Sequence, residues 1–118
     1  MKPFKICPKC SYKWRARDDF LADPSLCLVG FQADFKETES GHYLFNHILA
    51  DNLCNTTLAV KVEDFLSLYK KHIFEEIKFG SPACEEHCGN VEDLSQCPIE
   101  CKNAVARQIM QTSSHCKG

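Results

Sequence analysis

The sequence predicts a small α+β protein, in which an antiparallel β-meander carries a packed helix and is followed by a cysteine-rich helical hairpin. Three observations support this fold class. Alternating apolar residues in the first half of the chain are typical of half-buried strands, and one apolar stripe at helical spacing follows them. Nine of the 118 residues are cysteines, which predicts a fold stabilised by metal ions or disulfides in addition to its core.

The N-terminal sequence and the cysteine count bear on the location of the protein. The first residues contain no apolar run of signal-peptide length, and no later stretch is long enough to span a membrane. An odd number of cysteines also fits complete disulfide pairing badly. We therefore expect a cytoplasmic protein without a membrane partner, whose cysteines are reduced and available to bind metal.

The first element is a tight turn, Cys7-Pro8-Lys9-Cys10, which we call the knuckle. A short strand over residues 12–17 and a helical turn over 18–23 follow it, and we expect this strand to extend the meander. The meander itself is expected as three strands: Leu26–Phe35, His42–His47 and Thr56–Val62. In the first of them, alternate residues from Cys27 to Phe35 form an apolar face that should point inward, with Cys27 acting as a small buried hydrophobe.

Two helices are expected in the second half of the chain. The first begins at Glu63 and ends either near Lys71 or at Lys78, with its apolar side chains on one stripe that would pack across the meander. The second spans about residues 98–111 and places Cys101, Val105 and Ile109 on one face. These elements divide the chain into residues 1–80, with a first metal site, and residues 81–118, a helical hairpin with a second site.

The knuckle predicts the first metal site. Cys7 and Cys10 supply two thiolates on one side of a turn, which is half of a tetrahedral site. His47 ends the returning strand and Cys54 lies in the next loop, so both can face the knuckle. Zinc is the expected metal, because thiolate and imidazole are its commonest ligands. Two residues remain alternatives for the fourth ligand: Cys27 and His42.

The stretch Cys7-Pro8-Lys9-Cys10-Ser11-Tyr12 resembles the knuckles of zinc ribbons and rubredoxins, in which C-P-x-C is typically followed by glycine. Ser11 takes the place of that glycine, and residues 47–54 read H-x6-C in place of a second knuckle. The resemblance covers these six residues. It implies a zinc-ribbon-like metal clip within the meander and no particular activity, because ribbons serve purposes from transcription to scaffolding.

A second set of cysteines has the spacing of a metal cage. Cys84 and Cys88 are four residues apart, as are Cys97 and Cys101. On a helix, residues i and i+4 point the same way, so the two pairs can offer four thiolates to one point. Zinc is the first interpretation. An iron–sulfur cluster and two disulfides, Cys84 with Cys101 and Cys88 with Cys97, are the alternatives.

Basic residues are concentrated at the N-terminus. Residues 1–17 contain six cations and no acidic residue, although the whole chain has a net charge of −2. This cluster either forms a solvated face or binds an anion, and Trp14 between Lys13 and Arg15 either stacks on a nucleobase or covers the metal site. We expect Trp14 to cover the site, and we keep nucleic acid as a possible partner of the basic segment.

No motif for an enzyme is found in the sequence, which has no glycine-rich phosphate loop, no G-x-S-x-G and no H-E-x-x-H. The sequence therefore favours a non-enzymatic adaptor or regulatory module that docks another macromolecule, most simply a protein. A redox or iron–sulfur protein that uses the C-terminal cysteines is the first alternative, and a nucleic-acid-binding regulator is the second.

Overall fold

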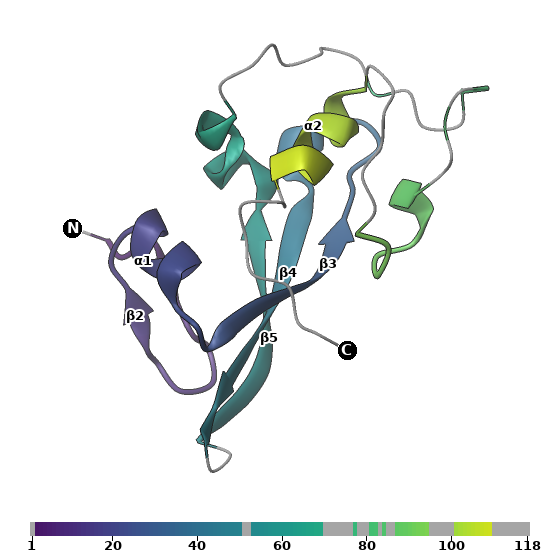
Figure 1. The fold of residues 1–118 in the computed structure, drawn as a ribbon. Helices are drawn as coiled ribbons and strands as arrows, with labels where there is room; N and C mark the ends of the chain where they lie inside the picture. Colours follow the sequence, from purple (N-terminus) through teal and green to yellow (C-terminus); the bar gives the residue numbers. More distant parts are fainter. Residues whose placement is uncertain are drawn as a thin grey trace.

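The computed structural model describes residues 2–50, 53–69, 77, 81–82, 84, 87–94 and 101–109. It shows a small α+β fold with two antiparallel sheets (Figure 1). The strands are β1 (Lys5–Ile6), β2 (Lys13–Trp14), β3 (Leu26–Gln32), β4 (His42–Leu49) and β5 (Cys54–Lys61). The helices are α1 (Arg17–Ala22) and α2 (Lys102–Ile109), with 3₁₀ turns at Thr38–Ser40, Val62–Asp64, Leu66–Leu68 and His87–Gly89.

The larger sheet is the three-stranded antiparallel meander that the sequence predicts, in the order β3-β4-β5. His47 on β4 pairs with Leu26 on β3 and with Thr56 on β5. One face of this sheet, which we call the inner face, is buried and carries Leu28, Phe31, Tyr43, Phe45, His47, Leu58 and Val60.

A β-bulge between Leu28 and Gly30 changes which residues of β3 point inward. Leu28 is buried before the bulge and Phe31 after it, whereas Cys27 is only half-buried on the opposite face. The extra residue of a bulge reverses the alternation of side chains along a strand. The predicted inward face from Cys27 to Phe35 is therefore wrong in its first half.

The knuckle forms a separate unit beside the meander. β1 and β2 pair antiparallel into a two-stranded sheet, so the expectation that the knuckle strand extends the meander is wrong. Two lysines of this unit reach across to β5: Lys5 Nζ donates to the carbonyl of Ala59 (3.0 Å), and Lys9 Nζ to that of Asn55 (3.2 Å). These contacts connect the two sheets through side chains and not through a continuous ladder.

Two different segments cover the inner face. At one end of the sheet, Tyr43 Oη donates to the carbonyl of Ala106 on α2 (2.6 Å). At the other end, α1 brings Phe20 against Phe45, with ring centroids 5.0 Å apart. Figure 1 shows α2 in front of the sheet and the knuckle with α1 beside it. The knuckle side of this arrangement contains the candidate metal site.

The helix predicted to begin at Glu63 is not formed in its first part. Residues 62–68 make two 3₁₀ turns, closed by bonds from Phe65 N to Val62 O (2.9 Å) and from Leu68 N to Phe65 O (3.0 Å). Phe65 is buried against Tyr43, and we attribute the tight turns to this early anchor. Residues 70–76 and 78 of the predicted helix lie outside the described part of the chain.

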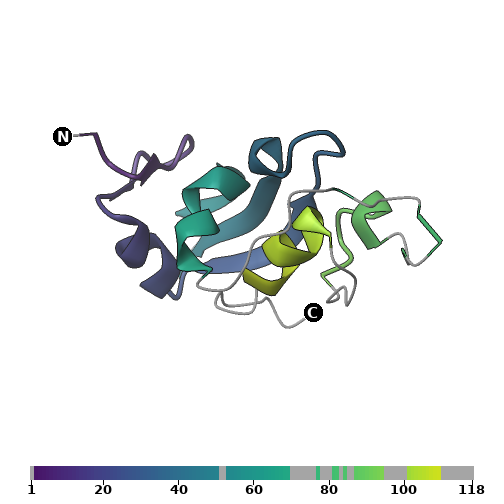
Figure 2. The ribbon, with the colours of Figure 1, turned by 90° about the horizontal axis from the view of Figure 1, so that it is seen from above.

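The C-terminal helix is confirmed over Lys102–Ile109, the centre of its predicted span. Cys101, Val105 and Ile109 are buried together as expected, and Figure 2 shows α2 beside the turns that follow β5. The helical hairpin, and the division of the chain at residues 80 and 81, stay predictions. Within the described residues, no helix has the length and apolar character that a bilayer crossing requires.

Candidate metal centre

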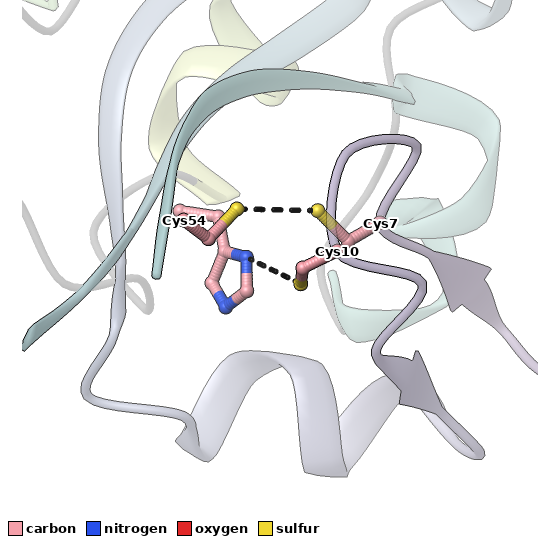
Figure 3. A group of neighbouring side chains, drawn as sticks. Cys7, Cys10 and Cys54 are labelled. Atoms are coloured by element: carbon pink, nitrogen blue, oxygen red, sulfur yellow. Dashed lines mark hydrogen bonds between the residues drawn. The ribbon is translucent and has the colours of Figure 1, made fainter. Parts of the chain in front are cut away.

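Four residues from two distant parts of the chain form one cluster of donor atoms. The Sγ atoms of Cys7, Cys10 and Cys54 and a ring nitrogen of His47 all lie within 4.8 Å of one another. Figure 3 shows Cys7 and Cys10 on the knuckle loop, facing Cys54 on the strand opposite. The quartet predicted from the sequence is therefore brought together, and it can hold a metal ion.

The distances within the cluster fit a tetrahedral thiolate site. Cys7 Sγ and Cys54 Sγ are 3.6 Å apart, and Cys10 Sγ and His47 Nδ1 are 3.9 Å apart. Two sulfurs bound to one Zn²⁺ at about 2.3 Å lie about 3.8 Å from each other. A disulfide would need about 2.05 Å, so the two thiols are unbonded and correctly spaced for a shared metal.

The knuckle presents its two sulfurs through a closed turn. Ser11 N donates to the carbonyl of Cys7 (2.9 Å), and Cys7 N donates to that of Tyr12 (2.8 Å). Ser11 has a φ of 67°, in the left-handed region that favours glycine. The residue that departs from the ribbon pattern thus adopts the conformation for which glycine is typical.

The meander supplies the other two ligands. His47 lies within β4, and Cys54 is the first residue of β5, paired with Leu49. Residues 47 and 49 share the inner face because side chains alternate along a strand, and Cys54 faces the same way as its partner Leu49. The prediction that Cys54 lies in a loop is therefore wrong: Cys54 is part of the β4–β5 ladder, which fixes its backbone.

Aromatic rings close the cluster from solvent. Trp14 is 1% exposed and lies edge-on to His47, with ring centroids 4.9 Å apart. Its indole Nε1 donates to Asp23 Oδ2 (2.8 Å), which fixes the ring. Cys7 and Cys54 are both 0% exposed. The prediction that Trp14 covers the metal site is confirmed.

The thiols of Cys7 and Cys54 have opposite pKa shifts. Burial alone would raise the pKa of Cys7, but hydrogen bonds from the backbone of Cys10 and Lys9 and from the His47 and Cys10 side chains lower it to about 6. Burial, together with the neighbouring sulfurs, raises the pKa of Cys54 to about 11. At neutral pH the cluster therefore carries a thiolate at Cys7 beside a protonated Cys54, and a bound cation would ionise Cys54 as well.

The alternatives for the fourth ligand are wrong. Cys27 is disulfide-bonded, and its partner lies outside the described residues. It is thus neither a ligand nor the buried free thiol that the sequence predicts. His42 pairs with Lys61 at the far end of β4, five residues from His47, and its side chain points to the opposite face.

The second predicted site is only partly described. Cys84, Cys88 and Cys101 are not disulfide-bonded, which rules out the predicted disulfides of Cys84 with Cys101 and of Cys88 with Cys97. Cys97 lies outside the described residues. The described donor groups that gather tightly enough for a metal are those of the first quartet alone, so the second cage stays a prediction.

Sequence reasoning missed a buried arginine near these cysteines. Arg107 on α2 is 0% exposed. Its guanidinium donates to Cys88 Sγ (3.4 Å) and to the carbonyl of Asp93 (2.6 Å), and lies 5.2 Å from the centre of the Phe31 ring. It joins the segment before α2 to the sheet. An arginine beside the buried stripe gives no signal in the sequence, because such residues are normally exposed.

Comparisons with protein-family models, with curated proteins and with solved structures found no match. The function is therefore argued from the site itself.

Replacing Ser11 tests the strain in the knuckle. Ser11→Gly should raise the free energy of unfolding by a few tenths to about 1 kcal/mol, and Ser11→Val should lower it by about 1–2 kcal/mol, because only glycine adopts this φ without cost. Urea denaturation of the metal-loaded protein measures both. The control is Ser40→Gly, at a position without positive φ, which should instead be slightly destabilising. Equal effects at both serines would contradict the argument.

The raised pKa of Cys54 predicts proton release when metal binds. At pH 7.5, adding Zn²⁺ to the metal-free protein should release protons from the cluster, one of them from Cys54, whereas Cys7, with its pKa of about 6, is already a thiolate and contributes almost none. Calorimetry in two buffers of different ionisation enthalpy counts the protons. Cys116→Ser, which leaves the quartet intact, should release the same number. The same titration at pH 9.5 separates a raised from an ordinary pKa, because Cys54 with a pKa of about 11 still holds its proton there; no proton release at pH 9.5 would show that the pKa of Cys54 is not raised.

Proposed function

We propose that the protein is a non-enzymatic, zinc-stapled adaptor or regulatory module of the cytoplasm that docks another macromolecule. The observation that carries this proposal is the buried cluster of Cys7, Cys10, His47 and Cys54, whose donor atoms lie within 4.8 Å of one another. Four protein ligands fill a tetrahedral zinc site and leave no position for substrate or water, which is the arrangement of structural sites and not of catalytic ones. Zinc here would act as a cross-link.

The cross-link accounts for how so short an N-terminal unit is held. β1 and β2 have two residues each, too few for an independent two-stranded sheet. A structural zinc site supplies on the order of 10 kcal/mol of binding free energy, similar to the net stability of a whole small domain. A second zinc at Cys84, Cys88, Cys97 and Cys101 belongs to the same proposal, and three of these cysteines are not disulfide-bonded.

A redox function of the C-terminal cysteines is the second candidate. It is favoured by the coexistence of a disulfide at Cys27 with reduced cysteines, not disulfide-bonded, at positions 84, 88 and 101. The contact between Arg107 and Cys88 also places a cation at one of these sulfurs, which stabilises a thiolate. Iron in the purified protein, or a reversible two-electron titration of its thiols, would favour this function over the adaptor.

Metal analysis of cysteine variants tests the zinc-stapled scaffold. Purified protein should contain about one zinc per chain at the first quartet and about two if the second cage is filled. Cys7→Ser and Cys54→Ser should each lose one equivalent and most of the folded structure, measured by mass spectrometry of the metal and by circular dichroism. Cys116→Ser is the matched control and should lose neither. A folded Cys54→Ser protein with its full zinc content would refute the quartet.

Thiol trapping in cells tests the cytoplasmic location. Structural disulfides are rare in reducing compartments, so the Cys27 disulfide should be open in a cytoplasmic protein and should close when the purified protein is oxidised. Alkylation inside cells, followed by denaturation with a chelator, should label all nine cysteines. Since one disulfide takes two of the nine, the oxidised protein should show at most seven. At most seven labelled cysteines in cells would place the protein in an oxidising compartment.

A further inference from the structure

Two open clefts lie on either side of the exposed side chains of Lys13 and Arg15. The first has a volume of about 470 Å³ and is lined by Tyr12, Asp19 and Asp23 in addition to these two cations. The second has a volume of about 380 Å³ and is lined by Lys2, Pro3, Lys13 and Arg15. Because Lys13 and Arg15 border both, the two clefts form one continuous surface, each part of which has the size of a small-ligand site.

The cations of this surface are not used by the fold. Three of the six N-terminal cations donate to the protein's own oxygens, on β5 and on the turns after it: Lys5, Lys9 and Arg17. The other three have exposed side chains that make no hydrogen bond or ion pair with the described residues: Lys2, Lys13 and Arg15. The second cleft is thus lined by three cations and a proline, a composition that attracts a phosphate.

The first cleft has a different chemistry. Tyr12 is 53% exposed, and its ring is held edge-on against Trp14, with centroids 5.1 Å apart. Asp23 accepts from Trp14 and Ser25, and Asp19 accepts from the backbone of Ala16, so both carboxylates are fixed in place. They repel a phosphate or an acidic peptide, and they offer acceptors to the amino groups of a base. An exposed aromatic ring is the usual platform for an unstacked base.

We propose that this surface binds single-stranded nucleic acid, with three successive phosphates against Lys2, Lys13 and Arg15 and an adjoining base on Tyr12. The proposal deepens the docking function above and rests on it, since it names the macromolecule. It also changes which aromatic residue is involved: Trp14, between the two cations in the sequence, is buried, and its neighbour Tyr12 is the exposed ring. The small contact area limits the footprint to two or three nucleotides.

Fluorescence anisotropy with labelled ten-nucleotide RNA and DNA tests the proposal on the zinc-loaded full chain. Binding should be detected at 20 mM salt, and log K should fall with log salt with a slope of about −2, as expected for three phosphate-neutralising cations on a single strand. The double variant Lys13→Ala/Arg15→Ala should bind at least tenfold more weakly, with a slope of about −0.7. Lys36→Ala is the control, because Lys36 is exposed but lines neither cleft.

Variants of Tyr12 separate base stacking from simple charge attraction. Tyr12→Leu should weaken binding about tenfold and leave the salt slope unchanged, whereas Tyr12→Phe, which keeps the ring, should bind like the original protein. No binding at 20 mM salt, or binding that these variants do not change, would overturn the proposal. Displacement of the oligonucleotide by polyglutamate at equal charge concentration would overturn it as well, in favour of an acidic protein partner.

Zinc content and circular dichroism of the same samples separate a failure of the nucleic-acid surface from a failure of the zinc-stapled scaffold. Zinc-loaded, folded protein that binds no oligonucleotide refutes the nucleic-acid surface and leaves the zinc-stapled scaffold standing. Protein without zinc refutes the scaffold. If the double variant loses zinc, Lys2→Glu serves in its place, because Lys2 is exposed and outside the knuckle; it should weaken binding at least tenfold, and unchanged binding would overturn the proposal.

Discussion

The structure depends on the closure of one four-ligand cluster between segments about 40 residues apart. Cys7 and Cys10 come from an isolated turn, while His47 and Cys54 come from the central hairpin of the meander. When the cluster closes, it also places Trp14 over His47 and α1 over Phe45. The hydrophobic packing of the N-terminal unit and the geometry of the cluster therefore support each other, and under the zinc proposal one cation would decide whether about a fifth of the chain, residues 2–23, is folded.

The cluster could be predicted from sequence because its chemistry is strict: few residue types bind zinc, and a C-P-x-C turn leaves little choice of geometry. The course of β3 could not be predicted from the sequence in this way. Both faces of Leu26–Phe31 are apolar, so alternation does not identify the inner one, and only Gly30 hints at the bulge that reverses it. The first part of the helix expected from Glu63 was wrong for a related reason. The apolar stripe alone predicts a helix there, whereas we attribute the observed 3₁₀ turns to the burial of Phe65.

Polar contacts of residues 87–94 connect the sheet with α2. The segment around residues 87–94 lies along β3, where Phe31 N donates to Val91 O (2.8 Å), and any side chain at Gly30 would come within 2.9 Å of Val91 Cγ1. Arg107 holds this segment from the other side through Asp93. A buried guanidinium needs several acceptors at once, so α2 and this segment must find their positions together. Composition and periodicity contain no trace of that requirement.

The lysine contacts on β5 have a consequence for solubility. β5 is an edge of the described sheet, and the carbonyls of Asn55 and Ala59 that receive Lys9 and Lys5 belong to its outer side. Unpaired edges invite strands from other copies, and lysine is the residue that commonly guards them. Here the lysines that cover the edge, Lys5 and Lys9, belong to the N-terminal unit, whose position is tied to the quartet. If zinc holds the knuckle as proposed, chelation would therefore uncover the edge and leave it open to strands from other copies of the chain.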